Sequence, residues 1–297
     1  MKTTNNVYQM VTDQIVKQME QGLIPWQQPW KRVKGGMEFA GCISHTTGRP
    51  YSWLNQMLLG MRVGEWLTFN QCKAEGGCVK AGEKASTVVF WTFLEKTEKD
   101  DETGEEKTKK IPYLKYYHVF HIDQCTGIKP RFEKVEQIST DDETKLQPIE
   151  ACEQVVKTYF DREDCTLTVR ESNKAYYSPA TDSVVVPMMK QYEVEGEYYS
   201  TLFHEITHST GHSKRLNRDG VTKIAAFGGE DYSREELVAE MGSAFMLHRL
   251  GVECQEAFRN SVGYIQGWLK ALKDDPKMIV FAAGKAEAAV EYIINGK

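Results

Sequence analysis

Two histidines and a glutamate in the second half of the chain form the pattern H-E-x-x-H, at His204, Glu205 and His208. On an α-helix, residues i and i+4 share a face, so both imidazoles can bind one metal ion. Zinc suits this arrangement, because two neutral imidazoles and one carboxylate leave its fourth position open for water. The ion lowers the pKa of that water to about 7, and Glu205 is placed to accept the proton. The pattern therefore predicts a metal-dependent peptide-bond hydrolase.

The third metal ligand is expected from the acidic segment Glu235–Glu240. In zincins that use a glutamate ligand, this ligand comes from a later helix, and an acidic residue four positions further on orients a ligand histidine. This spacing favours Glu236 as the ligand and Glu240 as the residue behind it. An alternative stays open, because Ser233-x-x-Glu236 is also a capping-box pattern that would occupy Glu236 at a helix start. Glu240 would then be the metal ligand.

His212 continues the four-residue spacing, but it is less suitable as a ligand. On one straight helix, positions 204 and 212 lie roughly 12 Å apart along the axis, which is too far for one ion. Gly211 also favours departure of the chain from the helix, and Lys214 stands where a longer histidine motif would place its last histidine. Three side chains are candidates to donate a hydrogen bond to a transition-state oxyanion, in an order that is left open: Tyr177, Tyr232 and His212.

The residues around this motif predict a domain that mixes helices with a small sheet. Apolar periodicity predicts helices over 148–160, 232–250, 258–273 and 276–294, the last with Asp275 as N-cap and Pro276 at its first position. Residues 165–170 are expected to form a strand, and residues 174–187 a hairpin with its turn at 178–182.

The first half of the chain combines aromatic and basic residues, with five of the six tryptophans in its first 91 residues. Aromatic faces stack unpaired bases and cations follow the phosphates, as sequence-tolerant binding of single-stranded nucleic acid requires. No signature of a duplex-reading motif is present. The alternative is that most of these rings fill the core. The candidate contacts are Trp26, Trp30, Lys31, Arg32, Lys34, Arg49, Tyr51, Trp53, Lys80 and Lys84.

Secondary structure in the first half is also expected to be mixed. Apolar residues every four positions predict a helix over 5–21, and a second helix is expected to begin near residue 51. Residues 86–94 and 111–120 are rich in β-branched and aromatic residues and predict two strands, joined by a charged, mobile connection over 95–110. The fold class is therefore α+β, with one domain over 1–135, a polar linker over 136–147 and a second domain over 148–297.

Bulk properties are those of a globular protein. The chain has 297 residues, of which 41% are hydrophobic and 27% charged, and its net charge is −5. Residues 1–135 carry 19 basic and 15 acidic side chains, whereas the remainder carries 18 and 27, so different partners are expected for the two halves. The seven cysteines are scattered without a C-x-x-C pair, which favours reduced thiols. No transmembrane run or signal peptide is seen, so we expect a cytoplasmic protein without a membrane partner.

The chain resembles the ArdC-type antirestriction proteins of conjugative plasmids nearly from end to end. In the first half, the residues that carry the resemblance are Ile24-Pro25-Trp26, Pro29-Trp30, Thr47-Gly48-Arg49-Pro50-Tyr51, Asn55, Leu58-Leu59, Trp66-Leu67-Thr68-Phe69-Asn70-Gln71, Gly76-Gly77, Val79, Val119-Phe120 and Asp123-Gln124. In the second half they are Ala175-Tyr176-Tyr177, Asp182, His204-Glu205, His208, Gly211-His212, Arg215-Leu216 and Glu235-Glu236-Leu237-Val238-Ala239-Glu240.

This resemblance implies an N-terminal domain that binds single-stranded DNA and a C-terminal zincin-like metallopeptidase domain. It also implies protection of incoming plasmid DNA from the recipient's restriction system. We expect Zn²⁺ as the ion, with Mn²⁺ or another divalent ion as the alternative, and a protein substrate that could belong to the restriction machinery. Two other hypotheses stay open: a DNA-binding module whose metal is structural or regulatory, and a DNA-recruited protease that acts on DNA-attached proteins.

Overall fold

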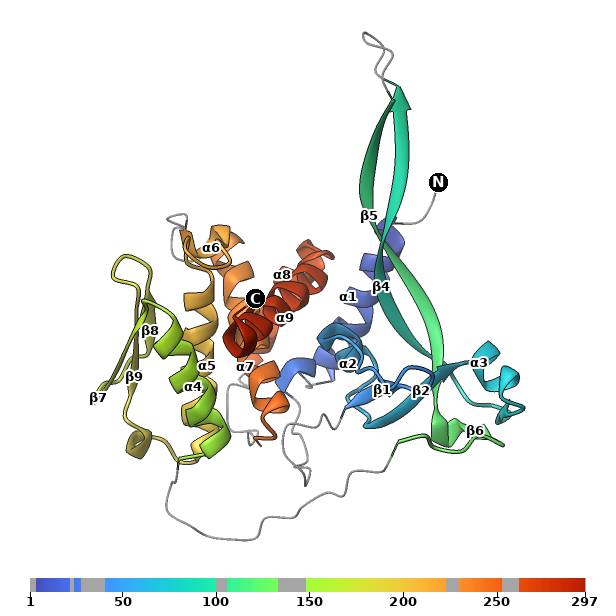
Figure 1. Cartoon of the computed structure of the whole chain (residues 1–297), viewed down its shortest axis with the longest axis horizontal. Coiled ribbons are helices and arrows are strands. Elements are labelled where there is room, and N and C mark those ends of the chain that lie inside the picture. Colours follow the sequence, from blue (N-terminus) through green and yellow to red (C-terminus); the bar gives the residue numbers. More distant parts are fainter. Residues whose placement is uncertain are drawn as a thin grey trace. The chain divides into compact units, whose positions relative to one another are not determined.

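The structure is a computed structural model of the chain, shown in Figure 1. It describes residues 4–21, 24–27, 41–99, 106–132, 148–222, 230–252 and 262–296. The chain forms two compact units. The first comprises Met1–Ile15, Gly41–Tyr51 and Asn55–Glu133, and the second comprises Val16–Ala40, Ser52–Leu54 and Lys134–Lys297. The predicted linker over 136–147 lies outside the described residues, so the predicted domain boundaries stay predictions.

The N-terminal helix α1 spans Thr4–Glu20, which confirms the helix predicted over 5–21. Its apolar residues recur every four positions, and those at Val7, Val11, Ile15 and Met19 are all buried. This periodicity places them on one face of the helix, which is the face that the protein covers. A short 3₁₀ helix, η1, follows at Pro25–Gln27.

The first unit is built on a four-stranded sheet with the order β1-β2-β5-β4. Its strands are β1 (Cys42–Ser44), β2 (Gly64–Thr68), β4 (Ser86–Lys99) and β5 (Glu106–His121). Strand β1 pairs in parallel with β2, whereas β2–β5 and β5–β4 are antiparallel. Short elements complete the unit: the part of α2 (Trp53–Leu58) from Asn55 on, α3 (Phe69–Ala74), β3 (Cys78–Val79), η2 (Ile122–Gln124) and β6 (Cys125–Thr126).

Strands β4 and β5 are longer than predicted. They pair continuously from Ser86 opposite Val119 to Lys99 opposite Glu106, so the expectation of a mobile connection over 95–110 was wrong for most of that stretch. The register places Glu95 opposite Lys110 and Glu98 opposite Lys107. The hairpin therefore extends through this charged stretch.

A buried cluster and a side-chain amide stabilise the sheet of the first unit. A buried cluster of Cys42, Leu59, Trp66, Val88 and Val119 covers one part of it. The side chain of Asn55 in α2 donates to the backbone oxygen of Val89 at 2.8 Å and accepts from its N–H at 2.7 Å. Strand β4 is at the edge of the sheet, and this amide pairs both the N–H and the C=O group of Val89, which have no strand partner on that side.

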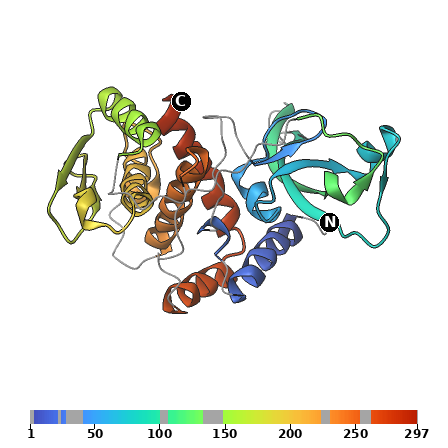
Figure 2. The same cartoon turned by 90° about the horizontal axis from the view of Figure 1, so that it is seen from below.

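The second unit contains a three-stranded sheet with the order β7-β9-β8. Its strands are β7 (Thr166–Arg170), β8 (Tyr176–Ser178) and β9 (Ser183–Pro187), which follow helix α4 (Glu150–Arg162) and precede η3 (Met189–Gln191). Strands β8 and β9 form the predicted antiparallel hairpin, and β7 pairs in parallel with β9. Figures 1 and 2 show the sheet on one side of the helices of this unit, beside α4 and α5.

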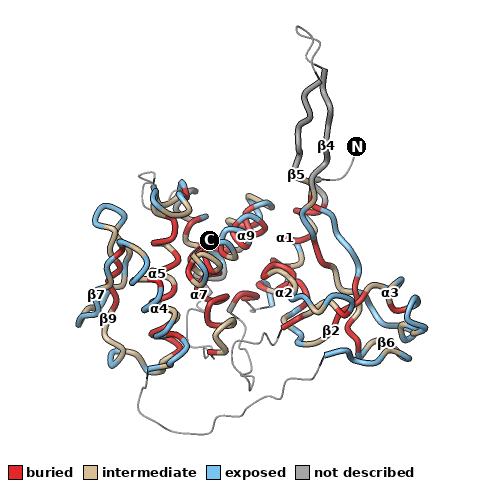
Figure 3. Tube along the Cα trace, in the orientation of Figure 1, coloured by how far each residue is buried: buried red, intermediate tan, exposed pale blue. Residues whose placement is uncertain are grey.

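In the described residues after this sheet, the helices are α5 (Glu195–Thr210), α6 (Asp219–Thr222), α7 (Glu230–Arg249), α8 (Val262–Asp274) and α9 (Met278–Asn295). Helix α5 packs against α7, α9 and the strands β8 and β9. Buried residues concentrate on α5, α7 and α9, as Figure 3 shows, so α5 is at the centre of the unit's core.

The predicted cap of the last helix was wrong. Helix α9 begins at Met278 with Lys277 as its N-cap, rather than with Pro276 in its first position. The Oδ1 atom of Asp275 accepts a hydrogen bond from the backbone N–H of Lys277 at 3.0 Å, so its side chain stabilises the turn before the helix. Within the part of the chain that the structure describes, no helix is both long enough and apolar enough to span a membrane.

Candidate metal centre

Helix α5 holds the H-E-x-x-H residues on a buried platform. Leu202, Phe203 and Ile206 on this helix are 0–1% exposed, which fixes the helix in the core. The remaining face carries His204 and His208, which are both partly exposed. The helix ends at Thr210, with Gly211 as its C-cap. His212 is therefore not part of the helix, in agreement with the prediction that the chain departs at Gly211.

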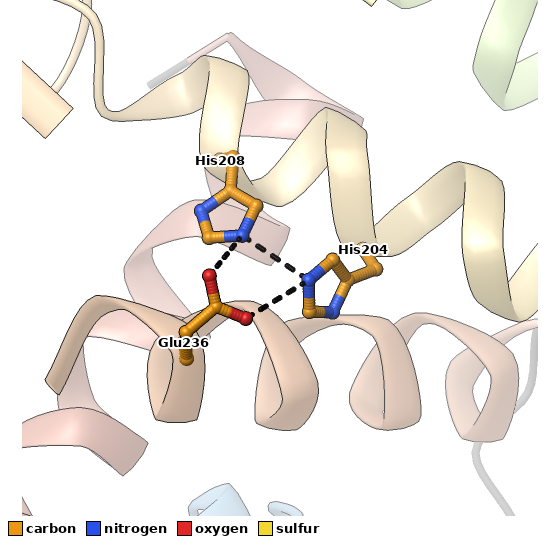
Figure 4. A group of neighbouring side chains, drawn as sticks. All are labelled: His204, His208 and Glu236. Carbon is orange, nitrogen blue, oxygen red and sulfur yellow. Dashed lines mark hydrogen bonds and ion pairs between the residues drawn. The ribbon is translucent and has the colours of Figure 1, made fainter. Parts of the chain in front are cut away.

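Three side chains from two helices converge at this place, as Figure 4 shows. The Nε2 atoms of His204 and His208 lie 3.1 Å apart. Each lies 3.5 Å from a carboxylate oxygen of Glu236 on α7. Candidate ligand atoms of the three residues all lie within 4.8 Å of one another. Two imidazoles and a carboxylate are a donor set that zinc and other first-row divalent ions accept, so these residues fit a metal ion.

The surroundings of Glu236 bear on the capping-box alternative. Helix α7 begins at Glu230, so Ser233 is inside the helix instead of at its N-cap. Glu236 therefore lies beyond the first turn, where its side chain faces the two histidines. Glu240 is one turn further along and does not belong to the group of candidate ligands found among the described residues. This geometry favours Glu236 over Glu240 as the third ligand.

A second carboxylate contacts the other ring nitrogen of His208. The Nδ1 atom of His208 lies 3.3 Å from Oε1 of Glu235, so Glu235 is beside this histidine. The expected role of Glu240 behind a ligand histidine stays a prediction. Arg218 in turn donates to both Glu235 oxygens, with Nη2 at 2.6 Å from Oε1 and Nε at 3.0 Å from Oε2. Both side chains are buried, so the pair forms a charge-assisted contact that fixes the ring orientation.

Arg218 is itself held by the end of α5. Its Nη1 donates to Oγ1 of Thr210 at 2.7 Å, and its Nη2 donates to the backbone oxygen of Thr207 at 2.7 Å. Gly211 leaves room for this arginine, because a Cβ atom at that position would lie 3.0 Å from its Nη2. Arg218, and the contact of Glu235 with His208, were not predicted from the sequence. The doubled glutamate at 235 and 236 was the available signal.

The charges of this centre are strongly coupled. Burial alone would lower the pKa of His208, but the carboxylates of Glu235 and Glu236 raise it to about 10. Burial by itself would raise the pKa of Glu236. Hydrogen bonds from His204 and His208 have a larger, opposite effect, so the pKa of Glu236 is well below its ordinary value. The pKa of Glu235 is also lowered, because His208 and Arg218 outweigh its burial. Both glutamates are therefore anionic at neutral pH, with Glu235 beside Nδ1 and Glu236 beside Nε2 of His208.

Glu205 is in a different environment from its neighbours. It is 8% exposed, and burial raises its pKa, although the nearby His204 and His208 act in the opposite direction. The backbone N–H of Tyr177, on the edge strand β8, hydrogen-bonds to its carboxylate. A buried carboxylate with a raised pKa is suited to accept and release a proton near neutral pH.

The candidates for oxyanion binding differ in their hydrogen bonds. The Tyr177 hydroxyl donates to Oδ1 of Asp182 at 2.8 Å, and Arg215 donates to Oδ2 of the same carboxylate at 3.1 Å. The Tyr177 hydroxyl proton is therefore committed to Asp182. The Nδ1 atom of His212 lies 3.8 Å from Oδ2 of Asp182. The side chain of Tyr232 lies outside the described residues.

Comparison with known proteins gives two family matches. Residues 5–120 match the N-terminal domain of the anti-restriction factor ArdC, and residues 154–285 match a zincin-like metallopeptidase. The chain is also similar to the crystal structure of the antirestriction ArdC protein from the R388 plasmid in its metal-free form. The match covers 96% of each of the two chains. The two chains are 32% identical in sequence, with a TM-score of 0.73. The chain belongs to the ArdC family of antirestriction proteins.

Further similar proteins extend this comparison. The Mn(II)-bound structure of the R388 ArdC protein is 30% identical, with a TM-score of 0.73 and 96% coverage of both chains. Two Escherichia coli proteins named DNA primase TraC are each 30% identical over 97% of this chain. The chain spans 20% and 27% of their lengths. The matches confirm the predicted α+β fold with an ArdC N-terminal domain and a zincin-like domain.

In this ArdC-family protein, two tryptophans predicted to stack on bases are core residues instead. Trp26 and Trp53 are 0% exposed. Trp26 packs edge-on against Trp268 with ring centroids 6.5 Å apart, and Trp53 stacks on Phe245 at 4.7 Å. Their assignment to DNA contacts was wrong. A large indole gains more from burial in the core than a surface position allows, and composition alone does not distinguish the two outcomes.

The other predicted DNA contacts fall into three groups. Arg49, Lys80 and Lys84 are exposed, although the Nζ atom of Lys80 also donates to the backbone oxygen of Asp123 at 2.7 Å. Tyr51 is partly buried and packs against the core cluster of the first sheet. The remaining predicted contacts lie outside the described residues: Trp30, Lys31, Arg32 and Lys34.

Proposed function

We propose that this protein binds single-stranded DNA with its N-terminal domain, hydrolyses peptide bonds at the centre on α5 and α7, and thereby protects incoming plasmid DNA from restriction. The observation that carries the enzymatic part is the convergence of His204, His208 and Glu236 beside the buried Glu205. Membership of the ArdC family supports the biological role.

The proposed ion is Zn²⁺, held by His204, His208 and Glu236. The relative from R388 has a Mn(II)-bound structure, and Mn²⁺ is the alternative for this chain. When bound, the ion acts as a Lewis acid that polarises the peptide carbonyl and acidifies water. Glu205 takes up the proton and passes it to the leaving amine. The backbone N–H of Tyr177 holds the Glu205 carboxylate, while Glu235 and Arg218 hold the ring of His208.

A catalytic ion is favoured over a structural one by the number of donors. Structural zinc sites have four protein ligands, whereas catalytic sites have three and keep one position open. The group found among the described residues has three members. Both histidines and Glu236 are partly exposed, with side-chain exposures of 14–27%, so a substrate can reach them.

Single-stranded DNA is proposed as the nucleic-acid partner. The match of residues 5–120 to the ArdC N-terminal domain supports a DNA-directed role for the first domain. Two proteins named DNA primase are similar to this chain over 97% of its length, which agrees with a DNA-directed role. The exposed cations Arg49, Lys80 and Lys84 can neutralise phosphates.

Replacement of Glu205 with Gln tests whether peptide hydrolysis is required. The substitution keeps the shape of the side chain but removes its capacity to accept a proton, so it should preserve metal and DNA binding. We expect plasmid transfer into a restricting recipient to fall to the level seen without the protein. Full protection by the Glu205→Gln variant would contradict a peptidase mechanism and favour DNA coating alone.

A further inference from the structure

Among the described side chains of the β4–β5 hairpin in the first unit, four large aromatic ones are exposed. Phe90, Trp91, Tyr116 and Tyr117 are each 44–48% exposed, although their sequence neighbours Val88, Val89, Leu114 and Val119 are at most 4% exposed. Exposed aromatic rings of this size lose the benefit of burial, so a cluster of them on one surface indicates an interaction site.

The pairing register separates these rings onto two faces of the sheet. Phe90 is directly opposite Lys115, and Val88 is directly opposite Tyr117. Directly paired residues share a face, and successive residues alternate between faces. Phe90, Lys115 and Tyr117 therefore lie on one face, whereas Tyr116 lies on the other, where its ring is 5.5 Å from that of His118.

Three rings form a continuous row on the first of these faces. The ring centroids of Tyr51 and Phe90 are 6.2 Å apart, and those of Phe90 and Tyr117 are 5.6 Å apart. Tyr51 packs against the buried cluster of Cys42, Leu59, Trp66, Val88 and Val119, so the row is anchored at one end in the core. The planes of Phe90 and Tyr117 meet at 72°, so the rings do not cover one another face to face. The row thus presents rigid aromatic surface to solvent.

Cations accompany this row. Lys115 is exposed and lies on the same face, at the position paired with Phe90. Arg49 is exposed and precedes Tyr51 by two residues. Aromatic rings that stack on bases, next to cations that contact phosphates, are the composition of a surface that binds single-stranded nucleic acid without sequence preference.

We infer that Tyr51, Phe90 and Tyr117 form a base-stacking row for single-stranded DNA, with Lys115 as a phosphate contact. This inference rests on the proposed DNA binding of the N-terminal domain and assigns it to one face of β4 and β5. Base stacking is thus assigned to these rings instead of the buried Trp26 and Trp53.

The two adjacent tyrosines of β5 provide a matched test. Tyr116 and Tyr117 are 48% and 46% exposed, but they lie on opposite faces. Fluorescence anisotropy with a labelled oligothymidylate would measure the affinity of the full-length protein and its variants. Loss of one stacking ring should weaken binding about tenfold, so we expect this loss for Tyr117→Ala and Phe90→Ala and unchanged affinity for Tyr116→Ala.

Two further measurements separate stacking from a structural effect. Phe90→Tyr and Tyr117→Phe keep a ring and should bind like the wild type, whereas Phe90→Leu should bind like Phe90→Ala. An abasic oligonucleotide, which offers phosphates without bases, should bind equally weakly to the wild type and to Tyr117→Ala. Circular dichroism would verify that each variant is folded.

The outcomes distinguish this inference from the proposed function. A wild-type protein that does not bind oligothymidylate would overturn the proposed DNA binding and the stacking row together. Binding by the wild type that persists undiminished in Phe90→Ala and Tyr117→Ala would overturn the row and leave DNA binding in place. Equal losses for Tyr116→Ala and Tyr117→Ala would also overturn the assignment to one face.

Discussion

His208 and Glu235 are joined by a contact of 3.3 Å between Nδ1 of the imidazole and Oε1 of the carboxylate. This contact leaves Nε2 of His208 directed at His204 and Glu236. A metal-binding histidine whose second nitrogen is held by a carboxylate has a fixed ring orientation and is a more basic ligand. Glu235 is therefore part of the centre, although it is not one of its candidate ligands.

Replacement of Glu235 with Gln should weaken metal binding about 10- to 100-fold, which is the typical effect of losing a carboxylate behind a ligand histidine. Competition with a chromophoric chelator would measure the affinity for Zn²⁺. Asp161→Asn removes a carboxylate that is more than 60% exposed, so it is the control and should bind Zn²⁺ like the wild type. Affinity in Glu235→Gln equal to that of the wild type would contradict the role assigned to Glu235.

The pair of Asp182 and Arg215 should make stability depend on acid pH. Burial raises the pKa of Asp182, but Arg215 and Tyr177 outweigh it, so the folded pKa is lowered. A carboxyl group with a lowered folded pKa stabilises the protein above its unfolded pKa of about 3.9. That stabilisation is lost as pH falls through the folded pKa. We therefore expect Asp182→Asn to lower the free energy of unfolding by about 3 kcal/mol at pH 7, because the buried Arg215 loses its nearest carboxylate.

Urea denaturation of the wild type and Asp182→Asn across acid pH would measure this effect, and the two stabilities should converge at the lowest pH values. Asp161→Asn is the control, because Asp161 pairs with Lys157 on the surface, where both side chains are more than 60% exposed. Surface pairs contribute little, so this variant should match the wild type. A constant difference between Asp182→Asn and the wild type at every pH would contradict the titration of Asp182.

Gly242 allows α7 to approach α5 closely. A Cβ atom at this position would lie 2.6 Å from Cγ2 and 2.7 Å from Oγ1 of Thr207. Gly242→Ala should therefore destabilise the protein by about 1–3 kcal/mol through overpacking, and should weaken metal binding, because these two helices carry the histidines and Glu236. Thermal unfolding and chelator competition would measure the two effects.

Gly284 provides the control for this substitution. It is also within a helix, α9, but an added Cβ would have no neighbour within 4 Å. Gly284→Ala should leave metal binding unchanged and stabilise the protein by about 0.5–1 kcal/mol through reduced backbone entropy. The double variant Gly242→Ala with Thr207→Ala should recover much of the loss, since it removes both clashing atoms. An unchanged melting temperature in Gly242→Ala would contradict this prediction, because it would mean that α5 and α7 accommodate the added methyl group without loss of stability.

The sequence was sufficient to predict what depends on local periodicity. The spacing of His204 and His208 places both on one helical face, and the apolar repeat of α1 defines its buried side. Contacts formed by packing between elements were not predictable in the same way. Arg218 reaches Glu235 only because the chain returns past the end of α5, and no local pattern encodes that return.

Which aromatic residues are buried and which are exposed could not be predicted from the sequence either. Trp53 and Phe90 are both large aromatic residues near basic positions, yet the first is 0% and the second 45% exposed. Their burial depends on which elements cover them, a property of the assembled sheet and helices instead of the residue type. The pairing register of β4 and β5 was needed to find the exposed row.

The central claim is that His204, His208 and Glu236 hold one divalent ion beside Glu205. The most direct measurement is the metal content of purified protein by inductively coupled plasma mass spectrometry after loading with Zn²⁺ and removal of free ion. We predict one ion per chain in the wild type and in Glu205→Gln, and its loss in His204→Ala and Glu236→Gln. A wild type without bound ion, or full occupancy in His204→Ala, would contradict the account.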